Sequence, residues 1–105
     1  MEHRVPGADV NPYLAVAAMI AAGLHGIEHE LPLEDAFSGN AYTTDASRVP
    51  TTLGAAADLL RDSGIARTAF GDAVVEHYVN AARVEVAAFE AAVTDWERIR
   101  SFERM

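Results

Sequence analysis

The chain has 105 residues, a length that suits one small domain or one part of a larger domain. Half of the residues are hydrophobic and 23% are charged, which excludes disordered and collagen-like compositions. No cysteine is present, so disulfides, thiolate nucleophiles and zinc fingers are excluded as well. Eight basic and sixteen acidic residues give a net charge of −8, which repels phosphate backbones and anionic membranes; we expect neither a nucleic-acid nor a membrane partner.

The N-terminal residues do not resemble a secretory signal, because Pro6, Gly7 and Asp9 stand where an apolar stretch would be needed. Together with the lack of cysteines, this favours a cytoplasmic protein. The same region holds the only strand candidate, since residues 2–6 alternate in polarity and Pro6 disfavours a helical conformation at Val5.

The first predicted helix begins at Pro12, because Asn11 is a favourable N-cap and proline is favoured at the first helical position. Residues 13–22 present no polar face, so every side of this helix should be covered by protein. A short chain rarely encloses a helix completely, which favours coverage by other subunits or by the rest of a larger chain over a compact bundle. The apolar run ends at Leu24 and is only about 20 Å long as a helix, shorter than a bilayer core of about 30 Å.

The end of this helix is expected between Gly26 and Glu30, because glycine weakens helices and Pro32 stops this one. The connection that follows, from Leu31 to Thr51, is long for a compact domain. Loops of more than about 12–15 residues usually have a function or lie across a neighbouring surface.

Three further helices are predicted after this connection. Thr51 or Thr52 caps the first of them, which ends at Ser63-Gly64, and residues 66–70 are expected to form a turn. The next helix follows a capping signal at Gly71-Asp72 and is strongly amphipathic. Its apolar stripe consists of Val75, Tyr78, Val79, Ala82, Val86, Phe89 and Val93, and its solvent face carries Glu76, Asn80, Arg83 and Glu90.

Thr94 and Glu97 have the spacing of a capping box, which opens a short last helix that runs to about Arg104. The predicted fold class is therefore all-α as the chain stands, with about four helices and a short extended N-terminus. All of residues 1–105 are expected to form a single unit.

Two histidine-containing patterns are candidate sites. His25, Glu28 and His29 match the H-x-x-E-H arrangement of a zinc protease, but Gly26 weakens the helix there and no further acidic ligand is identifiable; solvated or helix-capping histidines are favoured. His77 is adjacent to Tyr78, and neighbouring side chains point about 100° apart on a helix, so an acid–base pair is not expected.

Glu2 and Arg4 are the remaining candidates. On an extended strand, residues i and i+2 project to the same face about 6.5–7 Å apart. A carboxylate is a hard oxygen ligand for Mg²⁺, and a guanidinium can clamp a carboxylate or a phosphate in a bidentate manner. The pair could therefore hold a metal beside an anionic substrate, although two terminal charges are more often simply solvated.

A longer pattern gives these two residues a context. The segment from Glu2 to Ile27 resembles the E-x-R-x-P…N-P-Y-L-x-x-A-A…A-G-L-x-G-I segment near the end of the glutamine synthetase catalytic domain. Further pieces of the chain resemble the later part of the same family: Gly39-Asn40-Ala41-Tyr42, Leu53 with Ala56, Gly71 to Arg83, and Val93 to Glu97.

The resemblance implies an ATP-dependent ligase that phosphorylates the γ-carboxylate of glutamate and lets ammonia or an amine displace the phosphate. It places Glu2 at a carboxylate ligand of a divalent metal, Mg²⁺ or Mn²⁺, and Arg4 at the arginine that contacts the glutamate substrate and its developing phosphoryl charge. Pro6 to Asn11 and Gly39 to Tyr42 are similar to the branch that makes γ-glutamyl-polyamines and γ-glutamylputrescine.

The other metal ligands and the nucleotide contacts of the family precede this segment. The chain is therefore expected to be a C-terminal fragment of an α+β catalytic domain that is inactive alone and does not bind ATP tightly. Its expected protein partner is the remainder of the synthetase, or a second copy through the first helix. The alternative is a non-catalytic helical module or gene remnant that docks on synthetase subunits.

Overall fold

Helix α1 (Pro12–Glu28) begins at the predicted residue. The computed structural model describes His3 and residues 5–43 and 47–102. Asn11 Oδ1 accepts hydrogen bonds from the backbone N–H groups of Tyr13 at 3.0 Å and Leu14 at 3.3 Å, so two of the free donors at the helix start are satisfied. The helix ends within the predicted range, with His29 as its C-cap.

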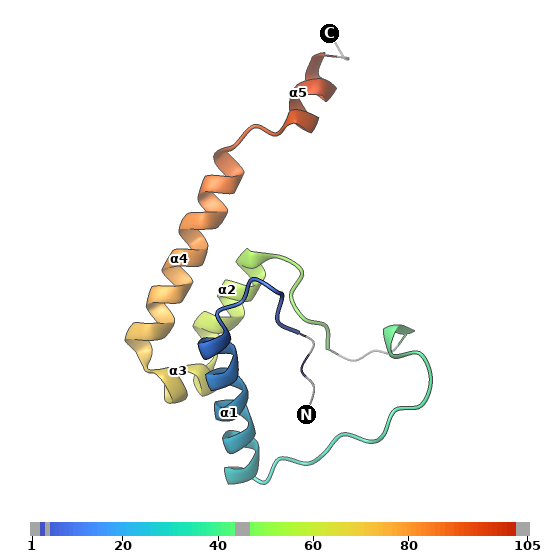
Figure 1. Ribbon diagram of the computed structural model, residues 1–105, viewed down its shortest axis with the longest axis vertical. Coiled ribbons are helices and arrows are strands. Elements are labelled where there is room, and N and C mark those ends of the chain that lie inside the picture. Colours follow the sequence, from blue (N-terminus) through green and yellow to red (C-terminus); the bar gives the residue numbers. More distant parts are fainter. Residues whose placement is uncertain (1–2, 4, 44–46, 103–105) are drawn as a thin grey trace.

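The long connection between α1 and α2 (Leu53–Asp62) is an exposed loop. Residues 31–40 and 47–52 are all solvent-exposed, and the 3-10 helix η1 (Ala41–Thr43) is the only helical turn within the described part of the loop. Figure 1 shows the loop swinging away from the helices before it returns to α2. It therefore contributes little to the core of this chain.

Helices α2 (Leu53–Asp62) and α3 (Gly64–Phe70) are separated by a single residue, Ser63. Thr52 caps α2 through a hydrogen bond from the Ala55 N–H to its hydroxyl oxygen at 3.2 Å. Ser63 ends α2 and also starts α3, because its Oγ accepts from the Ala66 N–H at 3.1 Å. The prediction of a turn at residues 66–70 was therefore wrong: the serine that stops one helix initiates the next.

Helix α4 (Asp72–Ala91) packs on α2, and this contact forms the centre of the fold. Gly71, which precedes α4, has φ = 81°, a conformation that glycine adopts without a Cβ clash, and it lets the chain reverse between α3 and α4. Val75 and Val79 are each 1% exposed and lie in the predicted stripe; with Ala57 of α2 they are the buried hydrophobic residues of the described chain.

The second half of the predicted stripe is not buried. Phe89 and Val93 are both 71% exposed. Helix α2 has 10 residues and α4 has 20, so at about 1.5 Å per residue α2 covers only half of α4. Val93 also lies beyond the end of α4. The apolar stripe is present as predicted, but no described helix covers its second half.

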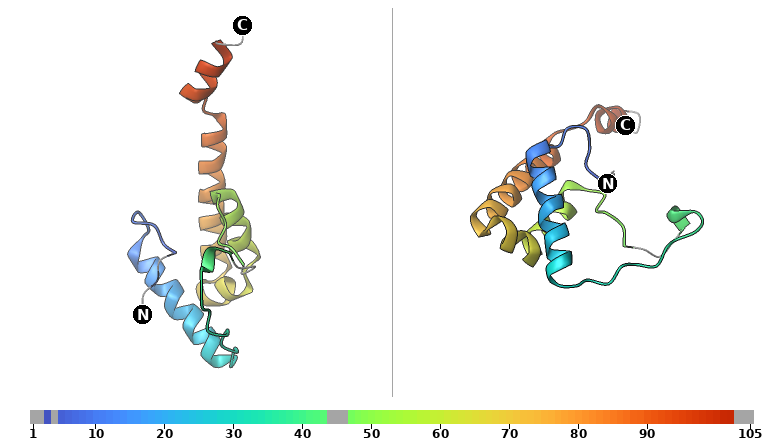
Figure 2. Two further views of the ribbon diagram at one scale, coloured as in Figure 1. Left: turned by 90° about the vertical axis from the view of Figure 1, so that its right-hand side faces the viewer. Right: turned by 60° about the horizontal axis from the view of Figure 1, so that its bottom comes forward.

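Helix α5 (Asp95–Phe102) begins with the predicted capping box. The backbone N–H of Thr94 donates to Glu97 Oε2 at 2.8 Å, and the N–H of Glu97 donates to Thr94 Oγ1 at 3.3 Å. Figures 1 and 2 show α5 extending beyond α4, away from the other helices.

The all-α class is confirmed, and the described residues form five α-helices where about four were expected. Among the described residues there is no strand, and those of the strand candidate, His3, Val5 and Pro6, have irregular backbone. Within the same ranges, no helix has both the length and the apolar character of a transmembrane span.

The molecule is open rather than globular (Figure 2). Its radius of gyration is 18.4 Å, whereas a compact domain of this length has about 13 Å. Its accessible surface is 9338 Å², against about 5,700 Å² for a compact monomer of this mass. The helices therefore share only a small core, where α2 packs on α4, and much apolar surface remains exposed to solvent.

Candidate functional site

The two residues predicted to carry chemistry, Glu2 and Arg4, both lie outside the described residues. The described chain that follows them leads directly into α1: a turn closed by a hydrogen bond from the Val10 N–H to the Gly7 carbonyl at 3.3 Å precedes the Asn11 cap. The roles of Glu2 and Arg4 stay predictions.

The H-x-x-E-H pattern falls at the end of α1, where His25 and His29 stack on each other. Their ring centroids are 4.0 Å apart with the planes tilted by 31°, and His29 Nδ1 donates to the His25 carbonyl oxygen at 2.9 Å. His29 is thus the C-cap of α1, one of the two roles favoured for these histidines. In the part of the chain that the structure describes, no group of three or more His, Asp or Glu side chains could hold a metal ion.

His77 and Tyr78 are neighbours on α4, with ring centroids 5.3 Å apart in an edge-to-face arrangement. Both side chains are exposed, and no described hydrogen bond joins them. This geometry gives no support to an acid–base pair, as the sequence indicated.

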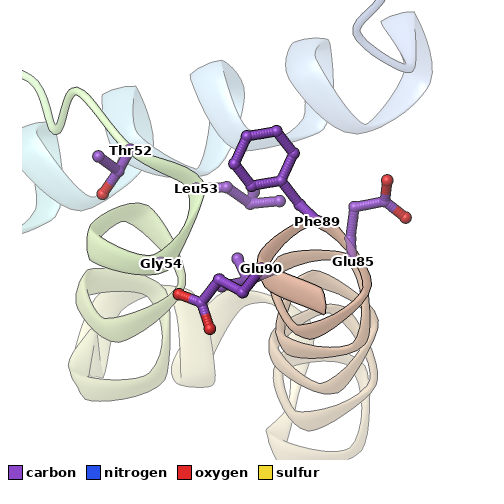
Figure 3. A pocket seen from close by; sticks show the side chains of 7 residues that line it. Thr52, Leu53, Gly54, Glu85, Phe89 and Glu90 are labelled. Carbon is purple, nitrogen blue, oxygen red and sulfur yellow. The ribbon is translucent and has the colours of Figure 1, made fainter. Parts of the chain in front are cut away.

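An open groove with a volume of about 520 Å³ lies between the start of α2 and the last turns of α4 (Figure 3). Its lining is mainly apolar and includes Leu53, Val86 and Phe89, together with Glu85 and Glu90. None of the seven described residues that line it is cationic. The groove therefore offers no positively charged group to the phosphates of a nucleotide.

Two observations bear on the metal and nucleotide site that the resemblance implies. Among the described residues there is no group of three or more potential metal ligands, and the groove between α2 and α4 has no cationic lining. Glu2 and Arg4 lie outside these residues, so the implied site stays a prediction.

A second, smaller cavity of about 160 Å³ lies where α1 meets the other helices. Its lining is apolar and comes from all four of α1, α2, α3 and α4: Leu14, Ala18, Leu60, Phe70, Val74, Val75 and Tyr78. This junction sets the direction of α1 and, with it, the place at which the residues before α1 enter the fold.

Arg67 fixes the helices around this junction. Its Nε donates to the carbonyl oxygen of Arg61 at the end of α2, at 2.8 Å. The two terminal nitrogens donate to Asp72 at 2.7 Å and Glu76 at 2.6 Å, both on α4. The hydrogen bonds to Asp72 and then Glu76 raise the pKa of the Arg67 guanidinium above its ordinary value. One side chain on α3 thus joins three helices.

A second ion-pair cluster lies on α2. Arg61 donates to both carboxylate oxygens of Asp62, at 2.8 and 2.9 Å, and to Asp58 at 2.8 Å. The hydrogen bond from Arg61 lowers the pKa of Asp62. Arg83 of α4 lies 3.8 Å from Asp58, which adds a contact between α2 and α4.

Neither the groove nor the Arg67 contacts were predicted from the sequence. The groove depends on where α2 stops along α4, which no local pattern gives. The spacing of Arg67 and Asp72 is not a helical one, because Gly71 breaks the helix between them. The signal that could have indicated the ion pair is the pair of opposite charges, Arg67 and Asp72, on either side of this glycine.

Comparison with known proteins places the chain in a family. The model of the glutamine synthetase catalytic domain matches residues 1–101. The gamma-glutamylethanolamide synthetase of Streptomyces coelicolor is 64% identical over 104 residues, which cover 99% of this chain and 22% of that protein. The glutamate–isopropylamine ligase of a Pseudomonas species is 40% identical, with 95% of this chain and 22% of the relative covered.

The gamma-glutamylputrescine synthetase of Escherichia coli is 33% identical, with 92% of this chain and 21% of the relative covered. The chain thus spans about a fifth of the length of these curated relatives. The match to the family model runs over nearly the whole chain and includes the segment that carries the resemblance. This protein belongs to the glutamine synthetase catalytic-domain family.

Proposed function

We propose that this chain supplies the C-terminal part of the catalytic domain of a glutamate–amine ligase. In the proposed reaction, the γ-phosphoryl group of ATP is transferred to the γ-carboxylate of glutamate, which gives ADP and γ-glutamyl phosphate. The amine nitrogen then attacks the γ-carbonyl carbon, phosphate leaves with the C–O bonding pair, and the nitrogen loses a proton. The observation that carries this proposal is the 64% identity to a gamma-glutamylethanolamide synthetase over 99% of the chain.

The acceptor is proposed to be a small primary amine rather than ammonia. Three relatives are named for ethanolamine, isopropylamine and putrescine amides of glutamate, and the most similar of these three is the ethanolamide synthetase. Relatives named simply as glutamine synthetases, such as that of Halobacterium salinarum at 36% identity, are less similar than the first two. Ethanolamine is therefore the first acceptor to test.

Glu2 and Arg4 are proposed to act in this reaction. Glu2 would be one carboxylate ligand of the divalent metal beside the nucleotide, and Arg4 would bind glutamate and neutralise charge as the phosphoryl group is transferred. A hard carboxylate ligand and a bidentate guanidinium suit these two tasks. ATP with Mg²⁺ or Mn²⁺ would be the cofactors, and the cytoplasm the location.

Turnover is proposed to require the remainder of a synthetase. The described residues bring together neither a metal cluster nor a phosphate site, and their apolar surfaces are largely exposed. The isolated chain should therefore contribute residues to an active site without forming one.

A chimera tests the proposal directly. The chain replaces the matching 104 residues of the Streptomyces coelicolor relative, and release of ADP is measured with glutamate, ethanolamine, ATP and Mg²⁺. The chimera should form γ-glutamylethanolamide. Glu2→Gln and Arg4→Gln should each lower kcat/KM by about 100-fold or more, because each removes a charge that stabilises the phosphoryl-transfer step.

Matched charge-removing controls lie on exposed parts of the chain. Glu34→Gln in the loop and Arg98→Gln on α5 should leave kcat/KM within about 3-fold of the unmodified chimera. A folded chimera that is inactive, or one in which Glu2→Gln and Arg4→Gln behave like these controls, would refute the catalytic proposal and favour a non-catalytic helical module.

A further inference from the structure

The C-terminal end of α1 holds a pair of histidines that the proposed ligase reaction does not use. His25 and His29 are four residues apart, so their side chains leave the helix on the same side, one turn apart. Their ring centroids are 4.0 Å apart. Two imidazole nitrogens on one metal ion are about 3 Å apart, since each lies about 2.0–2.1 Å from the ion. Rings this close can share one ion after a small rotation about their side-chain torsions.

One hydrogen bond fixes the tautomer of His29. A carbonyl oxygen can only accept, so the contact of 2.9 Å between Nδ1 of His29 and the carbonyl oxygen of His25 requires a proton on Nδ1. In the neutral ring the lone pair therefore lies on Nε2. Histidines that bind metals commonly donate their second ring N–H to a backbone carbonyl in this way. The hydrogen bond thus orients His29 as a metal ligand.

The backbone beneath the pair is held in place by the way the helix ends. The N–H of Leu31 donates to the carbonyl of Gly26 at 3.0 Å, and the N–H of Glu30 donates to the carbonyl of Ile27 at 3.3 Å. These are the two bonds of a Schellman motif, and Glu30, with φ = 49°, has the left-handed conformation that this motif requires after the C-cap. The two imidazoles are therefore preorganised, so that binding an ion orders little additional backbone.

The charges around the pair favour a cation. The C-terminus of a helix carries a partial negative charge, and Glu28 and Glu30 flank His29 in the sequence. No lysine or arginine occurs from residue 5 to residue 47, and the chain has a net charge of −8. His29 is exposed and His25 is half-buried, so an ion can reach the pair from solvent.

We propose that His25 and His29 form a two-imidazole site for a divalent transition-metal ion, with water in the remaining positions. The proposal does not depend on the proposed ligase function. Imidazole suits copper, nickel and zinc ions, and the affinity of nitrogen ligands is highest for Cu²⁺ in this series. Glu28 is not a ligand in this arrangement, because the described residues contain no group of three potential ligands. The site therefore differs from the zinc-protease arrangement of the H-x-x-E-H pattern.

A bound ion would act on the point at which α1 passes into the exposed loop (Figure 1). Residues 31–40, which follow the pair directly, are all exposed. An ion that binds the folded last turn of α1 but not its frayed form stabilises that turn by mass action. The start of the loop would thus respond to the availability of a transition metal.

Copper titration of the 105-residue chain tests the site. All variants carry His3→Gln, which removes a histidine close to the N-terminal amine, itself a copper ligand. Calorimetry should find one Cu²⁺ per chain, and electron paramagnetic resonance should show coupling of that ion to two imidazole nitrogens. His25→Gln and His29→Gln should each weaken binding at least about 10-fold, because a lone imidazole lacks a second ligand at high effective concentration.

His77→Gln is the matched control. His77 is exposed on α4, and the positions four residues before and after it are alanines, so it has no partner imidazole at that spacing. This change, like Glu28→Gln, should leave the affinity within about 3-fold of the parent. Mg²⁺ at millimolar concentration should not displace the copper, because Mg²⁺ prefers oxygen ligands. Circular dichroism should show the parent helix content in every variant, since neither histidine of the pair is fully buried.

Several outcomes would overturn the proposal. Equal copper affinities of the parent and the two α1 variants would do so, and so would coupling to a single nitrogen or an effect of His77→Gln as large as that of His25→Gln. Displacement by Mg²⁺ would show a carboxylate site instead. An effect of Glu28→Gln as large as that of His29→Gln would show a three-ligand site in place of the two-imidazole one.

The chimera described above provides a second measurement, which decides the matter if the isolated chain aggregates. His25→Gln and His29→Gln should each lower the copper bound by the folded chimera by one ion per subunit at a concentration that saturates the parent site, and an unchanged amount would refute the site. Because neither measurement involves turnover, loss of the metal site leaves the proposed ligase function untouched, and an inactive chimera that binds copper through the pair refutes only the ligase function.

Discussion

A terminal nitrogen of Arg67 on α3 lies 2.6 Å from Glu76 Oε1 on α4, nine residues further along the chain. The same guanidinium reaches Asp72 at 2.7 Å across the chain reversal at Gly71. These contacts fix the angle between two helices that share few apolar contacts. The arrangement of α3 against α4 therefore combines this ion pair with the apolar contacts of Phe70, Val74 and Val75.

Replacement of Arg67 should loosen this junction. Arg67→Met keeps the length of the apolar stem but removes three hydrogen bonds, so amide hydrogen exchange in α3 should become faster, whereas α2 and the first half of α4 change less. High salt should reduce the difference between wild type and variant, because a partly exposed ion pair is screened. Arg98→Met is the control: the Arg98 side chain is 65% exposed, against 30% for Arg67, and its guanidinium lies 3.6 Å from Asp95. Equal effects of the two changes would contradict the role given to Arg67.

The contact of α2 with α4 should depend on the buried Val79 far more than on an exposed valine of the same helix. Val79→Ala removes two buried methyl groups and should lower the local stability of this contact by about 2 kcal/mol. Val84→Ala, on the same helix but with a 62% exposed side chain, should change it by about 0.5 kcal/mol or less. Native-state hydrogen exchange of α4 amides measures both, and similar values for the two variants would show that the core lies elsewhere.

Helix α5 should lose stability on acidification. The Thr94 N–H, followed by the Thr94 hydroxyl, donates to the Glu97 carboxylate and lowers its pKa below the ordinary value. The unfolded state therefore binds the proton more readily, so this contribution is fully present above about pH 5 and is lost as the pH falls through the lowered pKa.

The fluorescence of Trp96, the single tryptophan, reports this transition because Arg100 lies 5.0 Å from its ring centroid within α5. Titration from pH 7 to pH 3 should change the emission of the wild type, and Glu97→Gln should flatten the profile. Glu90→Gln on α4 leaves the capping box intact and should keep the wild-type profile. A Glu97→Gln profile that matches the wild type would refute the assignment.

The isolated chain should not release phosphate. With ATP, Mg²⁺, glutamate and ethanolamine, phosphate release by the purified chain should equal that of its Glu2→Ala variant, because a two-metal nucleotide site needs several oxygen ligands and the described residues hold no group of three or more potential ligands. A coupled phosphate assay measures both. Release by the wild-type chain above the variant would show that the chain completes an active site by itself or as an assembly of copies.

Local signals in the sequence predicted the helix boundaries well where a side chain caps its own helix. Asn11, Thr52 and Thr94 all accept the hydrogen bonds expected of N-caps. Helix α3 was missed because Ser63-Gly64 has the composition of a helix end. The contact that stabilises α3 is made by Arg67 with residues of α4, and a window along the sequence does not contain that information.

The periodicity of α4 predicted which residues are apolar on one face but not how many are covered. Val75 and Val79 are buried, whereas Phe89 on the same stripe is exposed, because α2 is too short to reach it. In the candidate site, too, some features follow from sequence patterns and others depend on how the helices pack. Glu2 and Arg4 came from a family pattern and are still predictions, while the groove at Phe89 depends on how α2 and α4 lie together.

Helix α1 exposes an apolar row along its length, formed by Tyr13, Val16, Ile20, Leu24 and Ile27, and this row bears on the fate of the polypeptide in a cell. Chaperones and quality-control proteases recognise unfolded chains by accessible apolar segments, and a helix with aliphatic side chains along one open side offers such a segment even when it is fully formed. Copies without a covering partner would be held by chaperones or degraded. The steady-state amount of the polypeptide should then follow the amount of that partner rather than its own rate of synthesis.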